Sequence, residues 1–272
     1  MTPLDLLRRS YRRLARPLGR GLVRGHDVGR LRRFLGRYWD GARPPVFVIV
    51  LPNTIGWLEP CLKLVAPEVP LFLIANGLSK RARRELAGQF PQRPVFALST
   101  LPDAYAKHGT VLDLLIAATP GDLMVLDHDC YLFDPAPLAP VAWQPGEFIA
   151  AIDRPGFSTV NRASGLRFPR THFLVLHGAM MRDLRRRFGV GCEKVRYTPR
   201  CLVERLAAVG IGDQNYPPAA MPFYDTLQLA MAVAFAEGRR VRWLPVADGG
   251  IAHIGGTARA RNQPGLRPAG EE

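Results

Sequence analysis

The sequence predicts an α/β fold: a mostly parallel central sheet with flanking helices, in a single domain that follows a basic helical arm. Apolar runs of strand length alternate with helical stretches four times within residues 46–126. A run that is apolar throughout is buried on both faces, as strands are in a parallel sheet covered by helices. The chain has 272 residues, of which 47% are hydrophobic and 22% charged, so it can bury a full core.

The predicted arm spans residues 1–43. It holds twelve Arg against three Asp, which leaves a local net charge of +9. Thr2 as cap and Pro3 at the first helical position predict one helix, and Asp27 as cap predicts a second. The apolar stripe of the second helix comprises Val28, Leu31, Leu35 and Tyr38. Such an arm can lie on an anionic membrane surface, or its stripe can pack on the main domain, and both interpretations stay open.

The main domain is predicted over residues 44–260. Its first half should contain strands at 46–51, 70–74, 95–98 and from 123, with helices at 55–66, 80–89 and 109–118. Right-handed crossovers place the carboxyl ends of parallel strands at one edge of the sheet, where α/β proteins bind ligands. Pro52 and Asn53 follow the first strand and Asn76 and Gly77 follow the second, so they are expected at this edge.

The second half is less regular. Strands are predicted at 148–152, 172–176 and 241–244, and helices at 179–188, 199–209 and 226–237. Residues 210–222 are expected to form a loop, and residues 261–272 a polar tail. The four cysteines show no metal-ligand spacing and are interpreted as buried thiols.

The fold is organised around Asp127-His128-Asp129, which follows the apolar residues 123–126 directly. Because side chains on a strand alternate, the two carboxylates are predicted to point to one side and converge, with His128 pointing to the other. Two carboxylates at one sheet edge suit Mg²⁺ or Mn²⁺, whose other ligands come from water and phosphate. The alternative is a chance pair of aspartates in a polar turn or a helix cap.

The net charge of +14 favours an anionic partner, either nucleic acid or a membrane surface. However, 33 of the 37 basic residues are Arg, a skew that a GC-rich genome also produces. No recognisable nucleic-acid-binding motif is present, so no specific nucleic-acid partner is expected. The sequence also lacks an apolar run of membrane-spanning length and a secretory signal, which predicts a cytoplasmic location, peripheral to the inner membrane face if the arm binds lipid.

Three segments together resemble the nucleotide-sugar glycosyltransferases of the GT-A type, whose fold is related to the Rossmann fold. They are the aspartate strand, the helix start at residues 223–226, and residues 253–256, which read His-Ile-Gly-Gly. The resemblance implies that Asp127, Asp129 and His253 hold Mn²⁺ or Mg²⁺ against the diphosphate of a sugar donor. It also implies a hexosyltransferase that acts on an envelope, lipid-linked or saccharide acceptor. For His253 the alternative is a bystander beside a glycine turn.

The ends of the strands, and glycines that let the backbone approach a phosphate closely, suggest which residues bind the nucleotide. These are Pro52, Asn53, Asn76 and Gly77 at the strand ends, together with Asp127, Gly255 and Gly256. The sequence departs from the family after the second strand, where many members carry acidic residues and this chain has Asn76-Gly77. The identity of the base is therefore open.

A reaction that inverts the anomeric carbon needs a base for the acceptor hydroxyl. Asp225 is the first candidate because it begins a helix where the family often keeps its base, although a helix cap would also explain it. Asp153 is the reserve, and a retaining reaction needs neither. His108, His172 and His177 show no informative spacing. Two further hypotheses remain: a non-catalytic binding protein for nucleic acid or a membrane surface, and a nucleotidyltransferase that uses the same aspartates.

Overall fold

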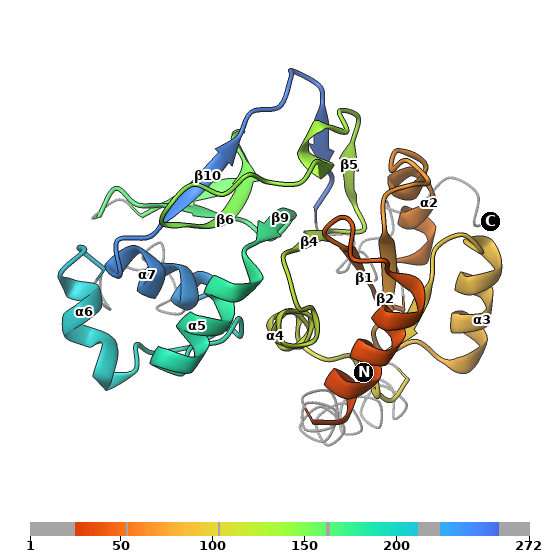
Figure 1. The fold of residues 1–272 in the computed structure, drawn as a ribbon, viewed down its shortest axis with the longest axis horizontal. Helices are drawn as coiled ribbons and strands as arrows, with labels where there is room; N and C mark the ends of the chain where they lie inside the picture. The colour runs from red at the N-terminus through yellow and green to blue at the C-terminus, as the bar shows by residue number, and fades with distance from the viewer. Residues whose placement is uncertain (1–24, 53, 103, 162–163, 212–223, 256–272) are drawn as a thin grey trace, which may run out of the picture.

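A seven-stranded sheet forms the centre of the molecule in the computed structural model, which describes residues 25–52, 54–102, 104–161, 164–211 and 224–255 (Figure 1). The strand order is β10-β6-β9-β4-β1-β2-β3. Six strands run in one direction, and β9 is antiparallel to both of its neighbours. The predicted fold class, a mostly parallel sheet with flanking helices, is confirmed. The bounds are β1 Val46–Val50, β2 Leu71–Ala75, β3 Val95–Ala97, β4 Leu123–Leu126, β6 Glu147–Ile152, β9 Phe173–Leu176 and β10 Arg240–Leu244.

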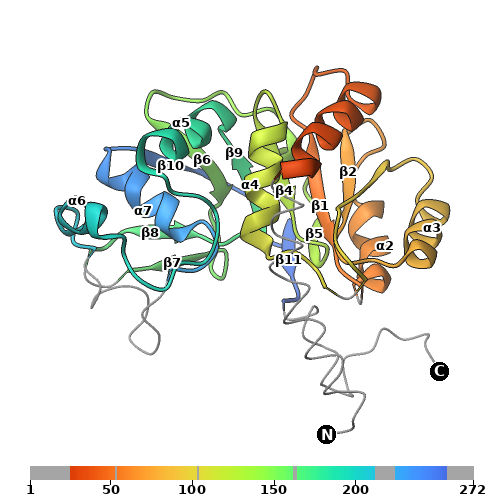
Figure 2. The ribbon, with the colours of Figure 1, turned by 90° about the horizontal axis from the view of Figure 1, so that it is seen from below.

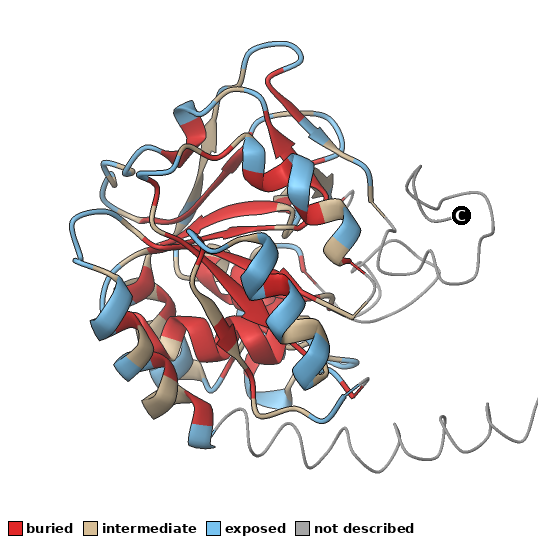
Figure 3. Ribbon diagram, turned by 90° about the vertical axis from the view of Figure 1, so that its right-hand side faces the viewer, coloured by how far each residue is buried: buried red, intermediate tan, exposed pale blue. Residues whose placement is uncertain are grey.

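Each face of the sheet is covered because successive side chains on a strand point to opposite sides. Phe47 and Ile49 pack against the helix over residues 25–38, α4 (His108–Ala118), α5 (Gly178–Phe188) and α7 (Gln228–Ala236). Val46, Val48 and Val50 pack instead with α2 (Ile55–Lys63) and α3 (Lys80–Gln89). Figure 3 shows the resulting layers, with buried strands between helices whose outer sides are exposed.

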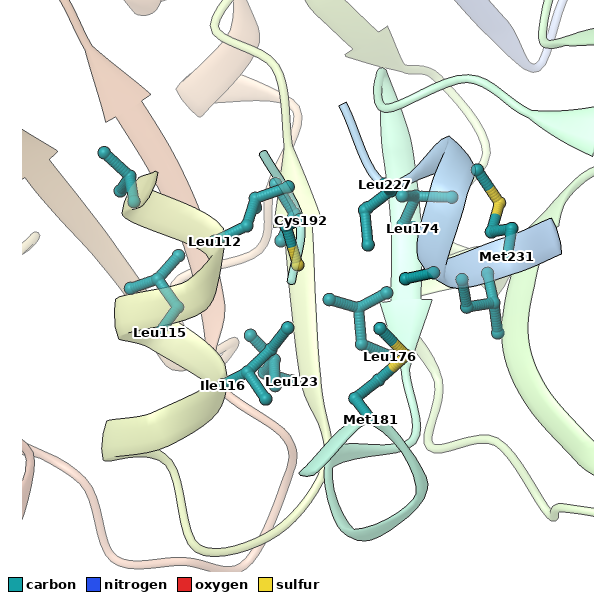
Figure 4. Close-up of a cluster of buried hydrophobic side chains, with 14 of the residues drawn as sticks. Leu112, Leu115, Ile116, Leu123, Leu174, Leu176, Met181, Cys192, Leu227 and Met231 are labelled. Atoms are coloured by element: carbon teal, nitrogen blue, oxygen red, sulfur yellow. The ribbon is translucent and has the colours of Figure 1, made fainter. Parts of the chain in front are cut away.

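Helix α4 lies across the middle of the molecule, beside β4 (Figure 2). Its apolar side chains meet those of β9 and the starts of α5 and α7, so both halves of the chain share one core (Figure 4). The side chains labelled in Figure 4 include Leu112, Leu115 and Ile116 of α4, Leu174 and Leu176 of β9, and Met181 of α5.

The helix over residues 25–38 belongs to this core. Leu31 and Leu35 are fully buried, whereas Tyr38 is exposed, so the stripe packs on the main domain as one of the two interpretations held. Asp27 is not a cap, because residues 25 and 26 before it are already helical. Its buried carboxylate accepts hydrogen bonds from Arg30 and from the side chain and backbone of Ser99. The helix over residues 25–38 therefore packs into the same core as the residues after the boundary expected at residue 43. Thr2 and Pro3, predicted to begin the first helix, lie outside the described residues.

Two short antiparallel sheets extend the fold, and the sequence did not predict either. One joins β5 (Cys130–Leu132) to β11 (Ile251–His253), and the other is the hairpin of β7 (Ser158–Val160) and β8 (Arg167–Pro169). Helix α7 begins later than expected because Leu227 before it has a φ of 67°. The segment predicted as a helix at 199–209 is a 3₁₀ turn, Arg200–Leu202, followed by α6 (Val203–Ala207).

Three of the cysteines, Cys61, Cys130 and Cys192, are buried as expected, and Cys201 is exposed, so that part of the prediction is wrong. Within the described part of the chain, none of the helices is long and apolar enough to cross a lipid bilayer. The predicted loop is described only at its first two residues, and the predicted tail lies outside the described residues.

Candidate active site

The aspartate pair lies in a turn between β4 and β5. Strand β4 ends at Leu126, and the backbone N–H of Cys130 closes the turn by donating to the carbonyl of Asp127 at 3.0 Å. The expected continuation of the strand through both aspartates is therefore wrong. The side chain of Asp127 is 22% exposed and that of Asp129 only 4%.

Strand β11 brings His253 to the two aspartates. It pairs antiparallel with β5, so that His253 lies opposite Cys130, next to the turn (Figure 2). His253 Nε2 lies 3.3 Å from Asp129 Oδ1 and 3.9 Å from Asp127 Oδ2. The structure thus brings together the three side chains predicted to hold a metal, although His253 lies 126 and 124 positions after Asp127 and Asp129 in the sequence.

A second histidine, His172, completes the cluster, and the sequence analysis missed it. Its Nδ1 lies 3.2 Å from Asp127 Oδ2, and its backbone carbonyl accepts from the Asp127 N–H. The rings of His172 and His253 are stacked, with centroids 3.4 Å apart and planes 21° apart. Because β9 is antiparallel to β4, its start meets the end of β4. His172 would have been placed here only if the strand at 172–176 had been known to run antiparallel to β4, and the apolar pattern of that strand does not report its direction.

The aromatic ring of Phe157 lies beside both imidazoles and forms an apolar wall of the cluster. The ring of Phe157 meets His172 edge-on, with centroids 5.7 Å apart, and lies 6.4 Å from the ring of His253. The β7–β8 hairpin holds this wall, since the Arg170 N–H donates to the carbonyl of Phe157. Arg154, just before Phe157, donates to the carbonyl of Ile251 and so ties the hairpin to β11.

Two buried side chains, Cys61 and His128, are uncharged although they lie close to the aspartates in the turn. Cys61 from α2 lies under the turn and contacts the carbonyl of Cys130 at 3.3 Å. Burial, followed by the charges of Asp129 and Asp127, raises the pKa of the Cys61 thiol to about 12. Burial lowers the pKa of His128, whose ring hydrogen-bonds the backbone of Ile49. Both groups are buried and are therefore uncharged at neutral pH.

The residues predicted to bind the nucleotide occupy several settings. Asn76 is buried, and its amide accepts from the Ala106 N–H and donates to the Ala106 carbonyl, so it holds the loop before α4. Gly77 has a φ of 79°, and a Cβ there would lie 3.0 Å from that of Tyr105. Pro52 lines a groove of about 900 Å³ between α2 and α3. Their nucleotide contacts remain predictions.

Gly255 is the one member of the predicted glycine pair that the structure describes. Its φ is 72°, in the left-handed region, and a Cβ there would lie 3.3 Å from the His253 ring. Gly256 and Asn53 lie outside the described residues.

The candidate base Asp225 lies before α7. Its Oδ1 accepts from the Thr226 N–H at 2.7 Å and from Lys194 at 2.6 Å. The reserve, Asp153, is paired with Arg167 at 2.5 Å. Lys194 and the Thr226 N–H both contact Oδ1, and Oδ2 of Asp225 accepts no hydrogen bond from the described residues.

His108 lies at the start of α4. Its buried Nε2 has no hydrogen-bond partner among the described residues. Burial lowers the pKa of His108, while the charges of Asp127 and Asp225 oppose that shift.

Comparison with known structures finds weak resemblances to glycosyltransferases and to other transferases. GlyE of Streptococcus pneumoniae TIGR4 is 10% identical over 54% of this chain and 40% of its own, with a TM-score of 0.37. WbbM, a bifunctional glycosyltransferase, is 12% identical over 76% and 39% of the two chains (TM-score 0.40). A structure titled mannose-1-phosphate geranyltransferase, from Thermus thermophilus, is 16% identical over 75% and 74% (TM-score 0.39). These scores are too low to support an argument about activity, and the chain spans only about two fifths of the first two proteins.

A match to a family model identifies the protein family of this chain. No curated protein matches the sequence closely enough to count as a relative. Residues 23–181, more than half of the chain, match the model of the StrH glycosyltransferase N-terminal domain. The match includes Asp127, Asp129 and His172 and ends before His253. It confirms the resemblance to glycosyltransferases that the sequence motifs implied: the chain belongs to the StrH glycosyltransferase N-terminal domain family.

Proposed function

We propose that this protein is a hexosyltransferase that moves a sugar from a nucleotide-diphosphate donor to a saccharide, envelope or lipid-linked acceptor. It would use Mn²⁺ or Mg²⁺ held by Asp127, Asp129 and His253. The observation that carries the proposal is the convergence of these three side chains at the carboxyl end of β4. Membership of a glycosyltransferase family supports the class of reaction.

The residues present fit a divalent cation. One oxygen of each carboxylate, Asp127 and Asp129, lies within 4 Å of His253 Nε2. Carboxylates and a neutral imidazole offer lone pairs to a cation and carry no positive charge. A bound cation would stabilise the negative charge that develops on the departing nucleoside diphosphate. Gly255, with no side chain, lets the backbone beside His253 approach a phosphate group closely.

Asp225 is proposed as the base for an inverting reaction. Lys194 and the Thr226 N–H hold Oδ1, which orients the carboxylate and leaves Oδ2 to accept a proton from the acceptor hydroxyl. Asp153 is less suited, because Arg167 already pairs with it.

The basic N-terminal segment is proposed to bring the protein to an anionic membrane surface that carries the acceptor. Arg33 and Arg37 are exposed on the helix over residues 25–38, whose opposite side is buried. Each basic side chain near such a surface contributes about 1 kcal/mol of attraction.

The test is the release of nucleoside diphosphate from a panel of nucleotide sugars, with Mn²⁺, Mg²⁺ or EDTA, by the parent protein and Asp129→Asn. The variant keeps the size of the buried side chain and removes its charge. At least one sugar donor should be consumed with a metal ion present, and Asp129→Asn should lower that rate by about 100-fold or more, since a Lewis-acid site contributes several kcal/mol.

Asp248→Asn is the matched control, because Asp248 is a fully exposed carboxylate on the loop that precedes β11. It should retain the parent rate. Full activity of Asp129→Asn, or equal rates in EDTA, would remove the proposal. Release of pyrophosphate from nucleoside triphosphates and a sugar phosphate would instead identify a nucleotidyltransferase.

A further inference from the structure

We propose that His172 is a second imidazole ligand of the cation, and that the His172–His253 pair makes the site bind Mn²⁺ in preference to Mg²⁺. The inference rests on the metal site of the proposed function and goes beyond it in two respects. It adds a ligand from β9 that no sequence motif indicated, and it chooses between the two metals.

The first support is geometric. Asp127, His172 and His253 each offer a ligand atom, and these three atoms lie within 4.8 Å of one another. They come from the ends of three different strands, β4, β9 and β11, which the long-range pairing of the sheets holds in place. With Asp129, the cluster offers two nitrogens and two carboxylates to a single ion.

The second support is the electronic character of the cluster. Both imidazoles direct a ring nitrogen at Asp127 Oδ2, and His253 directs the same nitrogen at Asp129. Carboxylate oxygens only accept, so each facing nitrogen must carry either a proton or a metal ion. A single divalent ion among the four groups is attracted by both carboxylates and by a lone pair of each imidazole, and the two rings lie stacked beside each other, with centroids 3.4 Å apart, on the same side of Asp127.

The third support concerns the choice of metal. Mg²⁺ prefers oxygen ligands at near-octahedral positions and keeps several of its waters. Imidazole nitrogens raise the affinity for transition metals, and Mn²⁺ is the member of that series that also suits carboxylates and phosphates. Two nitrogens in the donor set therefore favour Mn²⁺.

A competing role for His172 is that it only orients Asp127. The Nδ1 to Oδ2 distance of 3.2 Å fits a hydrogen bond, and metal-bound carboxylates commonly accept such bonds. The variant His172→Asn separates the two roles, because the amide can still donate to Asp127 but lacks the imidazole nitrogen.

The experiment is a titration of the full-length protein with Mn²⁺ alone, followed by electron paramagnetic resonance. Electron spin echo modulation from ¹⁴N nuclei counts the coordinated imidazoles. The parent should show two, and His172→Asn and His253→Asn one each. Both variants should bind Mn²⁺ about 10- to 100-fold more weakly, as loss of a site group commonly does. Their Mg²⁺ affinity, measured by competition, should change by much less.

The control is His26→Asn, an exposed histidine on the helix over residues 25–38, which should leave the spectrum and both affinities unchanged. A single coordinated imidazole in the parent, or parent-like Mn²⁺ binding by His172→Asn, overturns the inference and leaves His172 as an orienting residue. Equal affinity of the parent protein for Mn²⁺ and Mg²⁺ would also overturn the inference.

The outcomes distinguish this inference from the proposed function. A protein that binds Mn²⁺ through two imidazoles but consumes no nucleotide sugar keeps the metal assignment and loses the glycosyltransferase proposal. A protein that transfers a sugar with one imidazole on the metal does the reverse. Absence of Mn²⁺ binding removes this inference, and the proposed function then depends on whether a nucleotide sugar is consumed with Mg²⁺.

Discussion

At the scale of single residues, burial has a larger effect than the charges of carboxylates on the pKa of two histidines, His108 and His128. His108 is the clearest case: its Nε2 is buried without a hydrogen-bond partner among the described residues, and burial lowers the pKa of the ring below 6.5 despite the charges of Asp127 and Asp225. A lowered pKa means that the folded protein binds fewer protons than the unfolded chain below pH 6.5. Stability from this residue is therefore present above pH 6.5 and is lost as the pH falls.

The corresponding prediction concerns the pH dependence of the free energy of unfolding. It should fall as the pH is lowered from about 7 to 5.5, and His108→Gln should reduce that slope by up to about 1.4 kcal/mol per pH unit, the value for one proton. Urea unfolding at a series of pH values measures the slope. His26→Gln, at an exposed position, is the control and should keep the parent slope. An unchanged slope in His108→Gln would show that this imidazole is protonated equally in both states.

At the scale of elements, the start of α4 sets the distance between the two halves of the site. Gly109 is buried against the backbone of Cys192 and Glu193, so closely that a Cβ there would overlap the Cys192 carbonyl. The next residue, Thr110, donates from its hydroxyl to Glu193 at 2.7 Å. This contact fixes the segment that carries Lys194, and Lys194 in turn holds Asp225.

The prediction for this contact compares the effects of Gly109→Ala and Gly88→Ala, two substitutions inside helices, on the free energy of unfolding. Gly109→Ala should lower the free energy of unfolding by about 1–3 kcal/mol, because the backbone of the 192–193 segment must move. Gly88→Ala in α3 has open space around the added methyl and should raise it by about 0.5–1 kcal/mol through helix propensity. Denaturant unfolding measures both variants, and a neutral Gly109→Ala would mean that the two segments are not in tight contact.

At the scale of the whole molecule, the site requires the full length of the described chain. The family match ends at residue 181, inside α5, whereas His253 comes from β11 near the end of the described residues. Strand β10 pairs with β6, and α7 covers Phe148 of β6 together with Leu174 and Leu176 of β9. The matched portion alone would therefore leave a large apolar face of the sheet exposed to solvent.

This organisation predicts that a fragment of residues 23–181 does not fold as an independent unit. It should bind an apolar dye and show no cooperative thermal transition, because the lost helices and strands complete the common core. Circular dichroism during heating is the measurement, and a chain ending at residue 255, which keeps every described element, is the control. Cooperative unfolding of the short fragment would contradict the shared core.

The sequence predicted most of the sheet correctly, for a physical reason. Apolar runs such as residues 46–50 are buried on both faces, and burial of that kind requires helices on either side. The aspartate pair was also recognisable, because two carboxylates directly after a buried strand are costly unless a cation, a hydrogen-bond donor or solvent meets them. The alternation argument for their direction was wrong, because residues 127–129 form a turn.

By itself, the sequence determined which segments are buried strands and that Asp127 and Asp129 stand at the end of one of them. Only the tertiary structure decided which distant side chains join them. His172 arrives because β9 runs against its neighbours, and His253 because β11 pairs with β5. Hydrophobic periodicity reports the environment of a segment but not its direction or its partner, since strand pairing depends on backbone groups that every residue shares.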